Sequence, residues 1–201
     1  GLGDVYKRQV SIGVEGNSSG FGLKKIGIEI GSNNHIIVDK NGKTNLDNIY
    51  AVGDVIGPPW LAHVSSSEGL YVVEHIAKLS PKKIDYDCVP ACTYSKPEIG
   101  SIGLSQKILD ERGIDYKVVK SFFNANGKAV ASDSTEGFIK ILVSDRNQIL
   151  GAHIIGSNAT EMISEFSLAM SNNLSVENIL DSIHPHPTFS EAIFETLMQL
   201  R

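Results

Sequence analysis

Hydrophobic and polar residues alternate with a period of two over residues 137–144. In a strand there, Ile139, Ile141 and Val143 would point to one side, and the residues between them to the other. Further strands are predicted at residues 90–94, 99–103, 116–123 and 149–155. The second half of the chain is therefore expected to contain a β-sheet.

Helical patterns lie between and after these strands. A short helix is predicted from Ser105 to about Arg112, where Gly113 would end it. Another helix follows Asn158 and Glu161, which have the spacing of a capping box. Its apolar residues form one stripe, which we assign to packing or to a dimer contact: Met162, Ile163, Phe166, Ala169 and Met170. A sheet with helices on one side makes this part an α+β domain.

The first 80 residues show a different pattern. The expected elements are the end of a strand at Val10–Gly13, a loop over Gly20–Gly31, short strands at Ile36–Asp39 and Ile49–Val52, and a helix over residues 64–79. The run Ser80-Pro81-Lys82-Lys83 marks a boundary, so we predict two domains, residues 10–80 and 81–201. Residues 1–9 show no strand alternation and are set aside as a non-native leader.

Composition excludes several classes of protein. The chain is 41% hydrophobic and 20% charged, which is ordinary for a soluble globular protein. A net charge of −5 and a pI near 5.7 argue against a surface for nucleic acid or anionic membranes. No apolar run approaches the length of a membrane span, and no signal-peptide pattern is present.

Two motifs carry candidate chemistry, and the first is Gly53-Asp54 after the strand expected at Ile49–Val52. The glycine would let a ligand approach the backbone, and the carboxylate can accept hydrogen bonds from hydroxyl groups. A Gly-Asp pair alone is most often only a turn. Here a constrained loop follows, and the N–H groups at the start of the next helix suit an electron-rich acceptor; the loop is Gly57-Pro58-Pro59-Trp60-Leu61-Ala62-His63.

The second motif is the run His184-Pro185-His186-Pro187-Thr188-Phe189-Ser190-Glu191. Histidine titrates nearest to neutrality, and a carboxylate on its far nitrogen fixes the tautomer. The prolines hold both imidazoles on extended backbone. Thr188 and Glu191 also have the spacing of a capping box that would open a helix over residues 189–200, and this role is compatible with a catalytic one. The sequence leaves open whether the His186–Pro187 bond is cis.

The two cysteines, Cys88 and Cys92, are four residues apart in a predicted strand. Four strand residues span roughly 13 Å. A disulfide needs Cα atoms within about 7 Å. We therefore expect small buried thiols in a reducing compartment rather than a redox pair.

From Val10 to its last residue, the chain resembles the C-terminal part of the dihydrolipoamide dehydrogenases, which are flavin disulfide reductases. The resemblance rests on the strand-Gly-Asp signature at Ala51–Asp54, the loop at Trp60–His63, the run Val89–Leu104 and the string His-x-His-Pro-Thr-x-x-Glu ending at Glu191. It implies that residues 10–80 are the end of an NAD-binding domain and the C-terminal segment of an FAD-binding α/β domain, and that residues 81–201 are an α+β interface domain that mediates dimerisation.

The resemblance also implies a mechanism. A protein-bound dihydrolipoyl group would be oxidised, with electrons passing through a cysteine pair and FAD to NAD⁺. By residue match, His186 would be the general base and Glu191 its orienting partner, while His184 supports the turn. A homodimer is implied, in which each interface domain supplies His186 to the flavin site of the other subunit.

Cofactor contacts follow from the same resemblance. Asp54 would accept hydrogen bonds from the ribityl hydroxyls of FAD, and Trp60, Leu61, Ala62 and His63 would lie against the flavin, His63 through its backbone. Gly13 matches a glycine that touches NAD in the family. However, the run Val14-Glu15-Gly16-Asn17 stands where the family has Arg-x-Pro-Asn, which puts that assignment in doubt. No metal is implied.

The implied partner is a lipoyl-bearing acyltransferase of a 2-oxoacid dehydrogenase complex, or the lipoyl protein of glycine cleavage, in the cytoplasm or the mitochondrial matrix. The chain lacks the family's glycine-rich nucleotide loops and redox cysteine pair, so we expect it to be inactive alone and to bind FAD poorly. Alternatives are a mercuric-type reductase, a non-catalytic dimerisation module and a glutathione-type reductase, which usually has a second glutamate where Ala192 follows Glu191.

Overall fold

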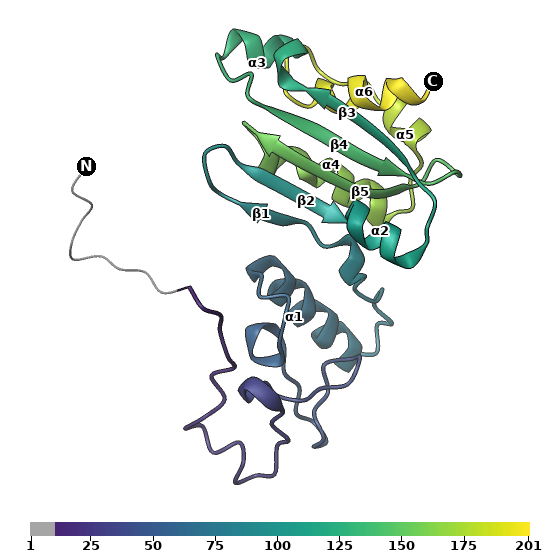
Figure 1. The fold of residues 1–201 in the computed structure, drawn as a ribbon. Coiled ribbons are helices and arrows are strands. Elements are labelled where there is room, and N and C mark those ends of the chain that lie inside the picture. The colour runs from purple at the N-terminus through teal and green to yellow at the C-terminus, as the bar shows by residue number, and fades with distance from the viewer. Residues whose placement is uncertain (1–10) are drawn as a thin grey trace, which may run out of the picture. The chain divides into compact units, whose positions relative to one another are not determined.

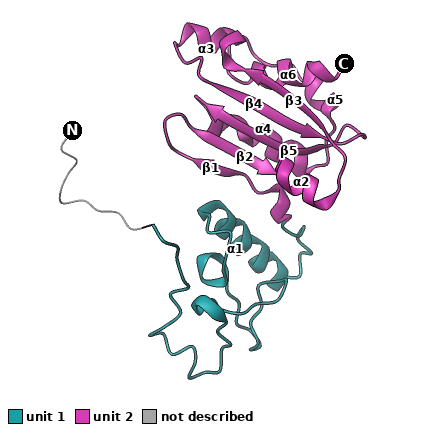
Figure 2. Cartoon of the chain, in the orientation of Figure 1, with its two compact units in different colours: residues 1–84 teal, residues 85–201 magenta. Residues whose placement is uncertain are grey.

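The computed structural model describes residues 11–201, which form two compact units (Figure 2). The division falls between Ile84 and Asp85, close to the boundary expected after residue 80. The leader expected over residues 1–9, and Val10 in the first expected strand, lie outside the described residues. Residues 11–13, which complete that expected strand, are not in a strand. No helix in the described part of the chain is both long and apolar enough to cross a membrane.

The second unit is built on a five-stranded antiparallel sheet with the strand order β1-β2-β5-β4-β3 (Figure 1). The strands are β1 (Ala91–Thr93), β2 (Ile99–Gly103), β3 (Lys117–Phe122), β4 (Gly137–Val143) and β5 (Ile149–Gly156). Each predicted strand agrees with the structure to within one residue at either end. The predicted alternation in β4 is also confirmed, because Ile139, Ile141 and Val143 belong to the main hydrophobic cluster, whereas Leu142, which is also buried, does not.

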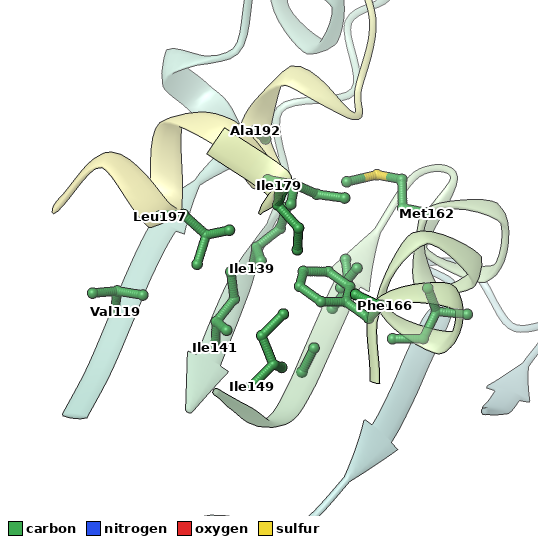
Figure 3. Close-up of a cluster of buried hydrophobic side chains, with 14 of the residues drawn as sticks. Val119, Ile139, Ile141, Ile149, Met162, Phe166, Ile179, Ala192 and Leu197 are labelled. Atoms are coloured by element: carbon green, nitrogen blue, oxygen red, sulfur yellow. The ribbon is translucent and has the colours of Figure 1, made fainter. Parts of the chain in front are cut away.

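Helices cover the core face of this sheet. Helix α4 (Ala159–Ser171) packs on β2 and β5, and α6 (Glu191–Leu197) packs on β3 and β4, with α5 (Val176–Leu180) beside α6. Figure 3 shows their side chains meeting those of the strands in one hydrophobic cluster. The predicted stripe on α4 therefore serves packing, with Phe166 at its centre and fully buried.

The shorter helices of this unit begin and end at residues that the sequence identifies. Helix α2 (Gln106–Arg112) is capped by the Ser105 hydroxyl, which accepts from the N–H of Ile108, and it ends at Gly113 in the left-handed conformation, as predicted. It lies near the other face of the sheet, where Lys140 Nζ donates to Gln106 Oε1 at 3.1 Å. Helix α3 (Gly127–Ala131) follows β3, after the 3₁₀ helix η4 (Phe123–Ala125).

The predicted capping box at the start of α4 is wrong. Asn158 occupies the N-cap position with φ of 61° and makes no side-chain capping bond. The Glu98 carboxylate takes that role, because its Oε2 accepts from the N–H of Thr160 at 3.2 Å and from the Thr160 hydroxyl at 2.7 Å. A capping box does occur at Ser175 and Asn178, where the sequence analysis had not placed one.

The first unit contains helix α1 (Ala62–Ile76) and the 3₁₀ helices η1 (Ser32–Asn34) and η2 (Gly53–Ile56). Helix α1 begins two residues before the predicted start at residue 64 and ends three residues before the predicted end at residue 79. The strands predicted at Ile36–Asp39 and Ile49–Val52 are wrong, since only isolated bridges form there, between Ile30 and Ile36 and between Lys43 and Tyr50. Backbone groups of these segments bond instead at single points, such as Ile36 N–H to the carbonyl of Val55 and Ala51 N–H to the carbonyl of Gly42, so no ladder forms within the described residues of the first unit.

Gly100 sets the distance between α4 and the sheet. A Cβ at this position would lie 2.4 Å from the carbonyl oxygen of Ala159 and 3.1 Å from Cβ of Ile163. Both obstacles belong to the first turns of α4, and a backbone carbonyl cannot rotate away as a long side chain can. The absence of a side chain at Gly100 therefore allows α4 to lie directly on β2.

We expect the substitution Gly100→Ala to destabilise the protein by about 1–3 kcal/mol, because α4 must move off the sheet. Thermal unfolding followed by circular dichroism measures this loss. Gly69→Ala is the matched control, since Gly69 lies within α1 and a Cβ there meets nothing within 4 Å. The control should keep or raise the stability. An unchanged unfolding temperature for Gly100→Ala would contradict the packing described here.

Candidate functional site

His186 and Glu191 form a hydrogen-bonded pair at the surface of the second unit. The distance from His186 Nδ1 to Glu191 Oε1 is 2.9 Å. The imidazole is 76% exposed, whereas the carboxylate is 21% exposed. Because a carboxylate accepts, Nδ1 carries the proton in this contact, and Nε2 of a neutral ring is left as the basic nitrogen. This is the geometry of a base held by an orienting acid.

The second oxygen of Glu191 fixes the carboxylate to the backbone. Oε2 accepts from the N–H of Thr188 at 2.8 Å. This backbone hydrogen bond is the main cause that holds the pKa of Glu191 below its usual value, and the hydrogen bond from His186 adds to it. Glu191 therefore stays ionised and keeps its bond to the imidazole. Its neighbour Glu195 has a raised pKa, because of burial and then because of the charge on Glu191.

The loop before α6 only partly matches the predicted capping box. Glu191 does reach back to the N–H of Thr188, but Thr188 is not the N-cap, and α6 begins at Glu191 rather than at residue 189. The hydroxyl of Thr188 donates to the carbonyl of Pro185 at 2.7 Å and lies 2.9 Å from Ser190 Oγ, so it does not cap the helix. The bond between His186 and Pro187, which the sequence left open, is cis.

Residues distant in the sequence hold this loop. Asn126 is almost completely buried, and its amide donates to the carbonyl of Thr188 at 3.1 Å while its oxygen accepts from the N–H of Ala129. Glu165 of α4 contacts His184 Nε2 at 2.9 Å. Neither Asn126 nor Glu165 could be predicted from the sequence, because 62 residues separate Asn126 from Thr188 and no local motif connects either residue to the loop.

The Gly53-Asp54 motif lies against the first turns of α1 in the other unit. Gly53 has φ of 76°, and a Cβ there would lie 2.9 Å from the Ser65 hydroxyl. Its N–H donates to the buried carboxylate of Glu68 at 2.7 Å. The missing side chain was interpreted as room for a ligand, but in the structure it makes room for α1. Asp54 is exposed beside it.

The loop before α1 presents the other residues predicted to face a flavin. Trp60 is 42% exposed and lies near the ring of His35, with 6.2 Å between the ring centroids. Leu61 is the N-cap of α1 and makes no side-chain capping bond. Ala62 and His63, in the first turn, are exposed. An exposed carboxylate, an aromatic ring and a helix start without a side-chain cap fit the hydroxyl and carbonyl groups of a flavin nucleotide.

The remaining candidate residues are less well placed. Gly13 is exposed, with φ of 113° and nothing within 4 Å of a Cβ. Cys88 lies in the 3₁₀ helix Tyr86–Cys88, so its predicted strand is wrong, whereas Cys92 is in β1. The two cysteines form no disulfide with each other, and both are half-buried rather than buried. Burial raises the pKa of Cys92. Residues 11–201 contain no group of three His, Cys, Asp or Glu that could hold a metal ion.

Dihydrolipoyl dehydrogenases from different organisms are similar to this chain over most of its length. The chain is 41% identical over 187 residues to the mitochondrial dihydrolipoyl dehydrogenase of Caenorhabditis elegans, covering 92% of this chain and 38% of that protein. It is 43% identical over 193 residues to a dihydrolipoyl dehydrogenase of Bacillus subtilis, covering 96% and 40%. The chain therefore spans about two fifths of the length of these relatives.

Solved structures share the fold. The structure of LpdA from Mycobacterium tuberculosis matches with a TM-score of 0.88 at 27% identity, covering 93% of this chain and 41% of that one. The HOCl-induced flavoprotein disulfide reductase RclA from Escherichia coli matches with a TM-score of 0.82 at 25% identity, covering 98% and 44%.

Two family descriptions match successive parts of the sequence. Residues 7–69 match the pyridine nucleotide-disulphide oxidoreductase domain, and residues 89–197 match the dimerisation domain of the same enzymes. The second match includes the sheet, α4 and the His186–Glu191 pair, and it covers more than half of the chain. Together with the α+β fold, it shows that this chain belongs to the pyridine nucleotide-disulphide oxidoreductase family.

Proposed function

We propose that this chain is the C-terminal part of a dihydrolipoyl dehydrogenase and carries the acid–base pair of that enzyme. The observation that supports this most directly is the 2.9 Å contact between His186 Nδ1 and Glu191. It leaves the other ring nitrogen exposed and basic, as dithiol oxidation requires. A free thiol titrates near 8.5, so a neighbouring base is needed to form the thiolate at neutral pH.

In the proposed reaction, His186 Nε2 accepts the proton of a substrate thiol. The thiolate attacks the family's redox disulfide and forms a mixed disulfide, and the second substrate thiolate then closes the substrate disulfide and releases the enzyme dithiol. The substrate loses two electrons, and the enzyme cysteines gain them. Glu191 stabilises the imidazolium that forms and keeps the ring oriented. FAD, when bound, would supply the acceptor for the electron pair of the enzyme dithiol, with NAD⁺ as the final acceptor.

The proposed flavin contacts lie in the first unit. Asp54 would accept hydrogen bonds from the ribityl hydroxyls, and the start of α1 at Leu61 and Ala62 would face the flavin with backbone N–H groups. Trp60 would provide apolar contact, and His63 would contribute its backbone. Gly13 is proposed to contact NAD, on the weaker basis of the resemblance alone. These proposed contacts are supported by the exposure of Asp54 and Trp60 and by the start of α1, which has no side-chain cap.

A homodimer is proposed because residues 89–197 match a dimerisation domain, and each subunit would supply His186 to the flavin site of the other. The partner protein would carry a lipoyl group, either on the acyltransferase of a 2-oxoacid dehydrogenase complex or on the lipoyl protein of glycine cleavage. The location would be the bacterial cytoplasm or the mitochondrial matrix, as the names and sources of the relatives suggest.

The substitution His186→Gln in the full-length protein should lower the rate of dihydrolipoamide oxidation by about 10²–10⁴-fold, because the base is lost. Steady-state kinetics with free dihydrolipoamide and NAD⁺ measure the effect. The control His153→Gln replaces a half-buried histidine of β5 that contacts the carbonyl of Leu104 and should keep the wild-type rate. Wild-type turnover in His186→Gln would instead identify the domain as a non-catalytic dimerisation module.

The ionisation of Glu191 gives a test that does not need catalysis. Its pKa is lowered in the folded protein, so the stabilisation is present above the unfolded value and is lost as the pH falls through the folded value. An NMR titration of the Glu191 carboxyl should give a midpoint below 4.5. His186→Ala should raise the midpoint only in part, because the Thr188 N–H is the larger cause. A midpoint that returned fully to 4.5 in His186→Ala would contradict the ranking of Thr188 above His186 as the cause of the lowered pKa.

The chain alone, as residues 1–201, should be inactive and bind FAD poorly, because it lacks the family's glycine-rich nucleotide loops. After mixing with FAD and gel filtration, the purified chain should be colourless, as measured by absorbance in the visible flavin band. A yellow protein that retains FAD through the column would show that Asp54 and the start of α1 are sufficient to hold the cofactor.

A further inference from the structure

His184 differs from His186 in every contact, although only one residue separates them. The side chain of His184 is 9% exposed, and its Nε2 lies 2.9 Å from Oε1 of Glu165 on α4. Its Nδ1 lies 3.2 Å from the carbonyl oxygen of Ser182, and its ring stands 6.0 Å from the ring of Phe194 on α6. The imidazole is therefore enclosed between two helices and its own loop.

Both nitrogens of His184 face oxygen atoms. The carbonyl of Ser182 can only accept, so Nδ1 carries a proton in that contact. Nε2 lies 2.9 Å from a carboxylate oxygen of Glu165, so both ring nitrogens have a partner. Hydrogen bonds that involve a charged group are about twice as strong as neutral ones. The contact with Glu165 thus gives the loop a strong attachment to α4.

This attachment adjoins the catalytic pair. Pro185 follows His184, and its carbonyl accepts from the Thr188 hydroxyl, while the N–H of Thr188 donates to Glu191. Hydrogen bonds thus connect Pro185 to Thr188 and Thr188 to Glu191 within the segment that follows His184. After Thr188 and His186, the charge of His184 also contributes to the lowered pKa of Glu191. Two carboxylates interact with His184: Glu165 on α4 by direct contact, and Glu191 on α6 through its charge.

We propose that His184 and Glu165 form a positioning pair that fixes the loop carrying His186 onto helix α4, and so sets the distance from the base to the thiol. The pair touches no reacting atom, and its role rests on the function proposed above for His186. A displacement of about 1 Å at a reacting group can cost about 10²-fold in rate, so a flexible loop would be slow even with its base intact.

The test uses the full-length protein with Glu165→Ala, His184→Gln and the double variant. Each single variant should lower kcat for dihydrolipoamide by about 10–100-fold with KM unchanged, because the loss affects alignment and leaves substrate binding intact. The double variant should be no slower than the slower single variant, since one interaction is removed in all three. Glu165→Gln, which keeps an oxygen for Nε2–H, should recover part of the loss.

Glu161→Ala is the matched control. Glu161 lies one turn before Glu165 on α4 and lines the same pocket of about 250 Å³, but Glu165 is the residue in contact with His184. The control should keep the wild-type kcat. The proposal is overturned if the control is as slow as Glu165→Ala, or if the losses of the two single variants multiply in the double variant. It is also overturned if Glu165→Ala and His184→Gln lower the unfolding temperature without changing kcat.

The NMR titration of Glu191 separates this proposal from the proposed function. In His184→Gln its midpoint should move towards the ordinary value, whether or not the protein turns over dihydrolipoamide. An unchanged midpoint would overturn the positioning pair even if His186→Gln abolishes activity. Conversely, a shifted midpoint combined with full activity of His186→Gln would leave the pair in place and reject the catalytic role of His186.

Discussion

The carboxylate of Glu191 is the group on which the site depends, because its two oxygens do different work. One accepts from the backbone N–H of Thr188, and the other accepts from the imidazole of His186. The first contact fixes the loop that precedes helix α6, and the second orients the imidazole. The same side chain therefore fixes the backbone of the loop and holds the imidazole proposed as the base, and neither contact displaces the other. The lowered pKa of this carboxyl follows from both contacts, with the backbone bond as the larger cause.

The rest of the second unit supports this carboxylate from a distance. The sheet and α4 form a rigid layer, because Gly100 allows close contact and Phe166 fills the space between them. Glu165 of α4 and the buried Asn126 then reach the loop from two sides. A surface-exposed histidine is thus carried by a segment that is held by the buried Asn126 and the partly buried Glu165. In such an arrangement an exposed side chain can reach a substrate while its orientation stays fixed.

Much of this architecture was predictable, because strands with alternating apolar residues and helices with local caps depend on near neighbours. Ile139, Ile141 and Val143 gave the direction of β4, and Gly113 gave the end of α2. The resemblance supplied the pairing of His186 with Glu191. The sequence could not reveal that Glu98 caps α4 or that Asn126 holds Thr188, since these contacts join residues 62 positions apart. The strand predicted at Ile49–Val52 failed because apolar residues alone do not provide a neighbouring strand.

The buried environment of Gly53 changes how its motif should be interpreted. A glycine followed by an acidic residue suggests a place where a nucleotide meets the main chain, yet here the space beside the α-carbon already belongs to Ser65, and the amide is engaged by Glu68. Mutagenesis that scored this glycine by loss of flavin would therefore report a helix forced out of position. The neighbouring Asp54 is exposed, so the flavin contact proposed for it can be tested by substitution without disturbing the scaffold.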